Sequence, residues 1–281
     1  VVGRSVCLRK QNGPYTKAFA RPFGNAEMTQ TSSILLIHPP VAKPCEPPAG
    51  VARLAGALRA AGIDCRVWDA SLEGLLDLIG RPAAADDTWS RRAAKSRDAH
   101  LAALRAPALY RNRDRYRRAV MDVNHLVRLA GSAAGTRMSL SDYGHPALSP
   151  VRSRNLVRSA ETFEANPFYP HFARRLRQLF EDRTPDIVGL SVNFMSQALC
   201  AFALIGFIRK RIPQAKIVVG GGLVTSWAAI PGFKNPFGGL VDDLVTGPGE
   251  AALLRMCGAT PVIELTAPGC GDTIPDWGCY L

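Results

Sequence analysis

Residues 34–69 decide the fold, and they read ILLIHPPVAKPCEPPAGVARLAGALRAAGIDCRVWD. The aliphatic run at 34–37 is stopped by two prolines, which is typical of a short buried strand. Apolar residues at helical spacing follow over 51–61, and Gly62 supplies a helix stop signal. Residues 65–69, which read CRVWD, are then predicted as a second strand. Strand, helix and strand in so short a stretch predict a βαβ unit with a parallel sheet.

The same alternation returns in the last third of the chain. Strands are predicted at 187–192, 216–219 and 240–245, with helices at 196–212 and 250–256. Five strands separated by helices predict an α/β fold with a doubly wound, five-stranded parallel sheet. The expected strand order is flavodoxin-like, within the broader Rossmann-like class.

A long segment at 73–184 interrupts this rhythm after the second strand. It shows helical patches at 110–129 and 172–180 and no convincing strand, so we expect a helical insertion that caps the sheet edge or forms a docking surface. Of the formal net charge of +12, much lies here: residues 81–183 hold 20 Lys and Arg against 10 Asp and Glu. Without a helix-turn-helix, zinc-finger or RNP-like pattern, this charge does not by itself predict a nucleic-acid partner.

The rest of the domain organisation follows from composition. We expect a flexible leader at 1–32, an α/β domain at 33–258 and an irregular linker at 259–281, with Met28 as the natural start. No apolar run approaches eighteen residues and no signal peptide is seen, so the expected compartment is the cytoplasm, with no membrane partner. The seven cysteines contain no CxxC pair, so most are expected to be buried small apolar residues rather than disulfides.

The candidate binding residues are those that follow the strands, because ligands of doubly wound sheets bind outside the carboxyl ends of the strands. These candidates are His38, Pro39, Pro40, Ser191, Val192, Asn193, Gln197, Gly220, Gly221, Gly222, Thr225, Gly247, Gly249 and Glu250. No GxxxxGK[ST], HExxH or GxSxG motif occurs, so no catalytic residue and no metal ligand is assigned.

Several of these residues have a second interpretation. The three glycines at 220–222 favour close approach of a ligand over a simple tight turn. The polar groups at 191–193 either contact a ligand or cap the next helix, for which Ser196 is the better candidate. The turn at 247–250 either offers N–H groups to an anion or simply opens a helix, where Glu250 is favoured by the helix dipole alone.

The residues that end the first two strands also have two interpretations each. His38 is either a metal or cofactor ligand or a histidine packed against Pro39, and the second interpretation is favoured. Asp69 ends the second strand, where nucleotide-binding folds place an acid on a ribose hydroxyl. No GxGxxG precedes it, which argues against NAD.

Taken in order, these stretches resemble the N-terminal domain of cobalamin-dependent radical-SAM proteins. The resemblance covers about residues 33–258 and is carried by 34–40, 67–69, 186–191, 217–222 and 247–250, with further likeness to a subgroup at 110–116, 148–150 and 166–168. It implies that the turn after strand one, the serine after strand three, the glycines after strand four and the Gly-x-Gly-Glu turn surround the corrin or its nucleotide tail. It also implies presentation of cobalamin to a substrate, often for methyl transfer.

The chain departs from that family in two respects. It has no DxHxxG motif, so cobalt would have a weak ligand or none from the protein below it. It also lacks the CxxxCxxC triad that holds a [4Fe–4S] cluster, and Cys270 and Cys279 are too far apart to supply it. The cluster and S-adenosylmethionine would therefore belong to a radical-SAM barrel in cis or from a split gene, and the chain would not be catalytic alone.

Two alternatives to a cobalamin domain stay open. One is a docking or substrate-binding module that keeps the fold but has lost the cofactor, with the arginine-rich insertion contacting substrate or partner. The other is a flavodoxin-like site for a smaller nucleotide. A wide cleft between Pro39, Ser191 and Gly221 would favour the corrin, whereas side chains filling it would favour the docking module.

Overall fold

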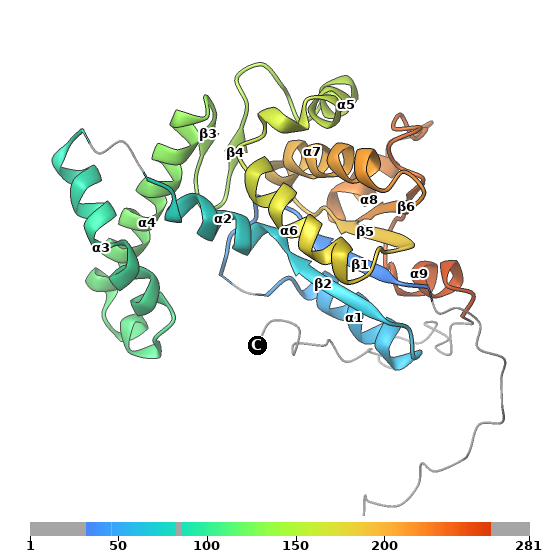
Figure 1. Cartoon of the computed structure of the whole chain (residues 1–281), viewed down its shortest axis with the longest axis horizontal. Helices are drawn as coiled ribbons and strands as arrows, with labels where there is room; N and C mark the ends of the chain where they lie inside the picture. Colours follow the sequence, from blue (N-terminus) through green and yellow to red (C-terminus); the bar gives the residue numbers. More distant parts are fainter. Residues whose placement is uncertain (1–31, 46, 83–85, 260–281) are drawn as a thin grey trace, which may run out of the picture. The chain divides into compact units, whose positions relative to one another are not determined.

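A computed structural model describes residues 32–45, 47–82 and 86–259 (Figure 1). The predicted leader up to residue 31, the proposed start at Met28 and the predicted linker from residue 260 lie outside the described residues. So do Cys7, Cys270 and Cys279. Of the other cysteines, Cys65 and Cys200 are buried as expected, Cys257 is half-buried and Cys45 is exposed.

The core of the fold is a five-stranded, wholly parallel sheet in the order β2-β1-β5-β6-β7. Its strands are β1 (Ile34–His38), β2 (Cys65–Asp69), β5 (Ile187–Ser191), β6 (Lys216–Gly220) and β7 (Asp243–Leu244). The predicted α/β class and flavodoxin-like order are confirmed. The last strand is shorter than predicted, because only two of its residues pair with β6.

Strand β1 is central, and every one of its residues is buried. Ile34 pairs with Cys65 on one side and with Ile187 on the other. Successive side chains point to opposite faces, so Leu35 and Ile37 join one hydrophobic cluster while Ile34 and Leu36 join a second. Burial on both faces explains why the sequence here is a continuous apolar run.

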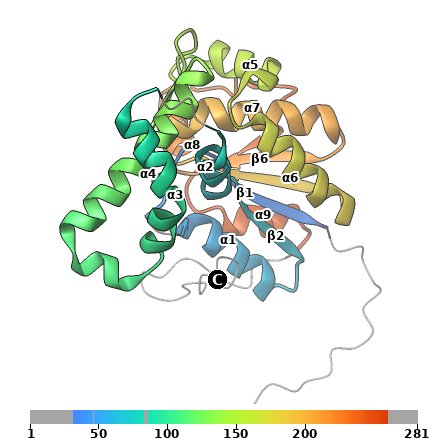
Figure 2. The same cartoon turned by 60° about the vertical axis from the view of Figure 1, so that its left-hand side comes forward.

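Helices cover both faces of the sheet (Figures 1 and 2). The smaller cluster packs under α1 (Ala49–Ala60) and α9 (Glu250–Met256), which contact each other. The larger cluster packs under α2 (Ala70–Gly80), α6 (Tyr169–Asp182) and α7 (Met195–Arg211), with the short α8 (Gly222–Ala228) after β6. No helix in the described ranges is long and apolar enough to cross a membrane.

The insertion is mostly helical, as predicted, but its elements differ from the prediction in detail. It contains α3 (Thr88–Leu104), a 3₁₀ turn (Pro107–Arg111), α4 (Arg113–Ala133), α5 (Ser153–Glu161) and a second 3₁₀ turn (Phe163–Ala165). Two residues each from β3 (Arg137–Met138) and β4 (Tyr143–Gly144) form a small antiparallel pair that the sequence did not predict. Helix α2, at the predicted start of the insertion, packs into the core instead.

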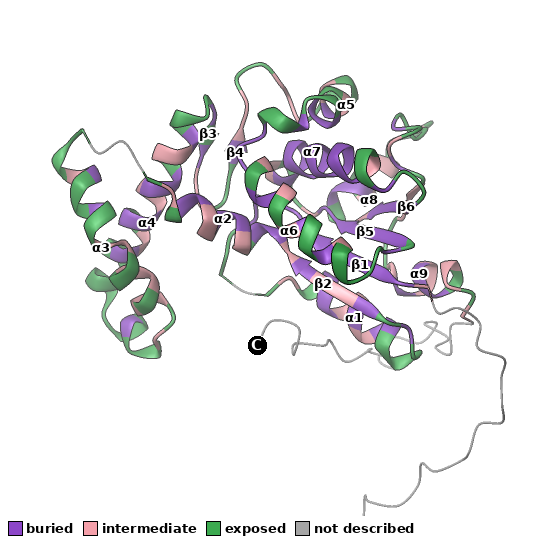
Figure 3. Ribbon diagram, viewed as in Figure 1, coloured by how far each residue is buried: buried purple, intermediate pink, exposed green. Residues whose placement is uncertain are grey.

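Helices α3 and α4 pack against each other, and much of their surface is exposed (Figure 3). Their contact is partly polar. The buried carboxylate of Asp122 accepts hydrogen bonds from Trp89 Nε1 at 2.7 Å and from Arg92 Nη2 at 3.2 Å. The Trp89 ring also stacks on His125 with centroids 3.9 Å apart. Because α3 buries few apolar side chains, these contacts fix how it pairs with α4.

Helices α5 and α7 cross at Gly206, where a Cβ atom would lie 1.9 Å from the carbonyl oxygen of Ala160. Gly206→Ala must push the helices apart, and we expect it to lower the free energy of unfolding by about 1–3 kcal/mol. Gly80→Ala is the matched control, since its Cβ would meet nothing within 4 Å. It should change stability by less than about 1 kcal/mol. Urea unfolding followed by circular dichroism measures both, and equal effects would show that the crossing is not tight.

Candidate cofactor-binding site

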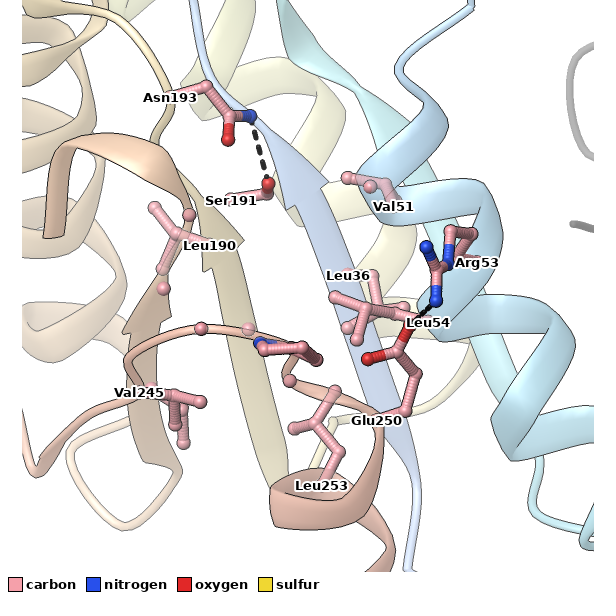
Figure 4. Close-up of a pocket in the computed structure, with 18 of the residues that line it drawn as sticks. Leu36, Val51, Arg53, Leu54, Leu190, Ser191, Asn193, Val245, Glu250 and Leu253 are labelled. Atoms are coloured by element: carbon pink, nitrogen blue, oxygen red, sulfur yellow. Dashed lines mark hydrogen bonds and ion pairs between the residues drawn. The ribbon is translucent and has the colours of Figure 1, made fainter. Parts of the chain in front are cut away.

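A cavity of about 410 Å³ lies between the sheet and helices α1 and α9, toward the carboxyl ends of the strands (Figure 4). It brings together nine of the fourteen candidate residues: Ser191, Asn193, Gly220, Gly221, Gly222, Thr225, Gly247, Gly249 and Glu250. These residues come from three separate stretches of chain. Their convergence supports the rule that placed the candidate site at the strand ends.

Sequence reasoning missed the opposite wall of this cavity. Helix α1 contributes Gly50, Val51, Arg53 and Leu54, and α9 contributes Leu253. The rule about strand ends does not point to helices. The available signal was Gly50 at the start of α1, where a Cβ would lie 3.6 Å from Ser191 Oγ and narrow the space between helix and sheet.

The glycine run after β6 is required by the backbone as well as by the cavity. Gly221 has φ +105°, and a Cβ there would lie 2.5 Å from the carbonyl oxygen of Val192. Gly222 N donates to Asn193 Oδ1 at 3.0 Å. Thr225 Oγ1 accepts from Gly247 N at 3.0 Å, which connects this turn to the turn after β7. Asn193 and Thr225 therefore hold the neighbouring turns together, and Gly221 allows the close approach between them.

Ser191 and Asn193 form one hydrogen-bonded unit at the end of β5. Asn193 Nδ2 donates to Ser191 Oγ at 3.1 Å, and no acceptor for the serine proton is found among the described residues. Neither residue caps α7, which removes that alternative. The expectation that Ser196 caps the helix is also wrong, because α7 begins at Met195 and the Ser196 hydroxyl donates to Val41 O at 2.8 Å.

Gln197 and Val192 do not line the cavity. Gln197 is fully buried, and its Oε1 accepts from the backbone N–H groups of Asn193 at 2.8 Å and Phe194 at 3.0 Å. Its Nε2 donates to Pro39 O at 2.7 Å. Gln197 thus joins the turn after β1 to the turn after β5, while Val192 belongs to the hydrophobic core.

His38, Pro39 and Pro40 are buried at the end of β1 and also lie outside the cavity. His38 faces a separate space of about 260 Å³, shared with Asp69. Asp69 Oδ1 accepts from Leu72 N at 2.9 Å and so caps α2, which gives this carboxylate a local structural role. Burial raises the pKa of Asp69. The described residues contain no group of three or more His, Cys, Asp or Glu side chains that could hold a metal ion.

Glu250 stands at the start of α9 with a buried side chain, and its Oε1 pairs with Arg53 Nη2 at 3.1 Å (Figure 4). No hydrogen-bond partner for its Oε2 is found within the described part of the chain. An anion at this turn would meet a buried carboxylate, so the geometry disfavours the anion interpretation of residues 247–250. The free oxygen instead suits a ligand that carries a hydroxyl or amide donor.

The cavity as a whole is apolar and close to neutral. Its walls include Leu36, Val51, Leu54, Val218 and Val245. Among the described lining residues, the charged ones are Arg53 and Glu250, and these are paired with each other. Such a space suits an uncharged, mostly apolar group with a few hydrogen-bonding atoms.

Comparisons with known proteins returned nothing: no family model, no curated protein and no solved structure matches this chain. The likeness to cobalamin-dependent radical-SAM proteins therefore rests on the ordered residues alone.

Gly221→Ala is expected to destabilise the fold by roughly 2–4 kcal/mol, because strained backbone and a clash with Val192 O act together. Gly62→Ala is the control. It also has a positive φ, but a Cβ there would meet nothing within 4 Å, so its loss should stay near 1 kcal/mol. Chemical denaturation compares them. A loss at Gly221 no larger than that at Gly62 would contradict the close approach between the two turns.

A pH prediction follows from His38. Burial lowers its pKa from 6.5 to about 4 in the folded chain. As the pH falls from 7 to 4, the unfolded chain binds a proton here that the folded chain does not, so the free energy of unfolding falls by roughly 3 kcal/mol from this residue. His38→Gln lacks this titration and should lose correspondingly less stability over the same interval. Urea unfolding at both pH values tests this, and parallel losses in the two proteins would refute it.

Proposed function

We propose that this chain binds cobalamin, with the base and ribose of its nucleotide tail in the cavity under α1 and α9 and the corrin across the carboxyl ends of the strands. The single observation that carries the proposal is the cavity itself. It has apolar walls, a glycine-lined opening and two polar groups with spare hydrogen-bonding capacity, Ser191 Oγ and Glu250 Oε2.

The nucleotide tail fits these features well. A flat base would contact the aliphatic walls formed by Leu54, Val218 and Leu253, and ribose hydroxyls could donate to Glu250 Oε2. A volume of about 410 Å³ lies in the usual range for small-molecule sites, roughly 300–1,000 Å³. The corrin macrocycle is much wider than the tail, so it would remain outside.

The surface beside the opening offers a place for the corrin. Phe194 and Met195 follow Asn193 and are 56% and 39% exposed. Large apolar side chains exposed together at a ligand-binding edge indicate a surface that something else covers. Pro39, expected to border the cleft, is buried with its carbonyl bonded to Gln197, so the opening is bounded by Ser191 and Gly221 instead.

Cobalamin, when bound, would supply methyl-transfer chemistry, and the residues of this chain would bind and orient it. Cobalt would have no histidine ligand from this chain, since His38 is buried beside a different cavity. The [4Fe–4S] cluster and S-adenosylmethionine would be held by a radical-SAM barrel in cis or from a split gene. A cytoplasmic location is part of the same proposal.

A second candidate, a site for a smaller nucleotide, is supported by the same observation. The cavity matches a base and ribose without requiring the rest of cobalamin. The two candidates differ in the surface outside the cavity, which would contact the corrin of cobalamin but would not be needed for a smaller nucleotide.

The test is retention of hydroxocobalamin by the purified 281-residue chain after gel filtration, read from the corrin absorbance. We expect about one corrin per chain. Cobinamide, which has the corrin but lacks the nucleotide tail, should be lost on the column. Retention of a free nucleotide without cobalamin would favour the smaller ligand, and retention of neither would overturn both candidates.

Val245→Trp should abolish retention, because a large ring would fill the cavity that Val245 lines. Val151→Trp is the matched control, since Val151 is 71% exposed on the insertion and does not line the cavity. Equal retention by both variants would show that cobalamin does not use this cavity. Thermal melts confirm that each variant is folded.

A further inference from the structure

A second, larger space lies in the insertion, away from the cobalamin cavity. It is a groove of about 540 Å³ formed by α2, α3, α4 and the turn after β1. Aliphatic side chains of α2, α3 and α4 form much of its walls, and its lining includes Lys43, Leu72, Arg105, Tyr110, Tyr116 and Met121. We call this space the insertion groove.

The walls of the insertion groove are apolar, and their few polar atoms are partly satisfied within the protein. Tyr110 Oη donates to Leu104 O at 2.8 Å, and Asn124 Oδ1 accepts from Leu140 N at 2.9 Å. Leu72, Tyr116 and Met121 are large apolar or aromatic residues that remain exposed. Large apolar side chains that are exposed together around a groove are typical of a ligand-binding or interaction site.

The charge of the insertion groove has one sign. Lys43 and Arg105 are its charged residues among those described, and neither Asp nor Glu lines it. Both cations are exposed, and no ion pair is found for either within the described residues. Each is therefore able to pair with a negative group brought by a ligand.

Further positive charge lies beside the groove at the start of α4. Arg111, Arg113, Arg115, Arg117 and Arg118 are all exposed, with Asp114 as the sole acidic residue of this run. Arg113 lies three residues before Tyr116 on α4, and therefore on the same face of the helix as this groove-lining side chain. The field around the groove therefore attracts anions.

We propose that the insertion groove binds a single-chain amphiphile, with its hydrocarbon chain along the apolar walls and its anionic head on Lys43 and Arg105. The apolar walls of the groove select the chain, and its uniformly positive charge selects the head. The groove begins at the turn after β1, whose residues Lys43, Pro44 and Cys45 also border the space beside His38. This site is independent of the cobalamin proposal and can be tested without that cofactor.

The probe is dodecyl phosphate below its micellar concentration, titrated into the full chain by isothermal calorimetry. We expect saturable one-to-one binding. Dodecanol, which keeps the chain without the charge, should bind at least about tenfold more weakly. Inorganic phosphate, which keeps the charge without the chain, should show no saturable binding. Binding of dodecanol as tight as that of dodecyl phosphate would overturn the role of the cations.

Variants locate the site. Met121→Glu places a carboxylate in the groove at a residue that is 47% exposed, so binding should be lost while the fold is kept. Lys43→Met should weaken binding about tenfold and leave the binding of dodecanol unchanged. Val151→Glu is the matched control outside the groove and should bind like the unmodified chain. Unchanged binding by Met121→Glu would refute the proposal.

Two further outcomes identify a different partner. Binding to phosphatidylglycerol vesicles without binding to monomeric dodecyl phosphate would show that the positive charge around the groove binds a membrane surface. It would overturn the proposal that the groove is a ligand site. A single-stranded oligonucleotide could instead bind tightly while dodecyl phosphate does not bind. If Met121→Glu did not weaken that binding, the positive charge around the groove would belong to a nucleic-acid site and the proposal would be overturned.

Discussion

The buried side chain of Gln197 is the constraint on which the arrangement of the turns at the carboxyl ends of β1 and β5 depends. It accepts from the backbone at Asn193 and Phe194 and donates to Pro39 O. These contacts span the junction between β1 and β5, where the strand order reverses and where ligands of such sheets bind. A fully buried amide with three hydrogen bonds allows few alternative arrangements, because each broken bond would leave an unsatisfied polar group.

Asn193, whose backbone N–H is bound by Gln197, connects this junction to the rest of the site. Its side chain donates to Ser191 Oγ and accepts from Gly222 N, so β5 and the turn after β6 are fixed together. Thr225 then connects that turn to Gly247. The cavity is thus built on backbone turns that hold one another in place. A site of this kind is largely preorganised, which reduces the ordering cost of binding.

The sheet could be predicted from the sequence because a strand that is buried on both faces has a continuous apolar sequence, as at 34–37 and 187–190. The sheet-side wall of the cavity followed from the same rule, since residues just after such strands must gather at one edge, whereas the wall formed by α1 and α9 did not. The role of Gln197 could not be predicted, because a buried amide and a ligand-contacting amide look alike in sequence. Helix α3 was missed because polar contacts such as Asp122 with Trp89 help to position it, and these leave little apolar periodicity.

The EPR spectrum of the chain with divalent cobalamin tests most directly whether the base of the nucleotide tail enters the cavity under α1 and α9. If the base lies in the protein cavity, it cannot coordinate cobalt, and with no histidine from this chain to replace it the spectrum should lack nitrogen splitting from a lower ligand. We expect this base-off spectrum, with a return to the base-on form in Val245→Trp. A base-on spectrum in the bound state of the unmodified chain would contradict it.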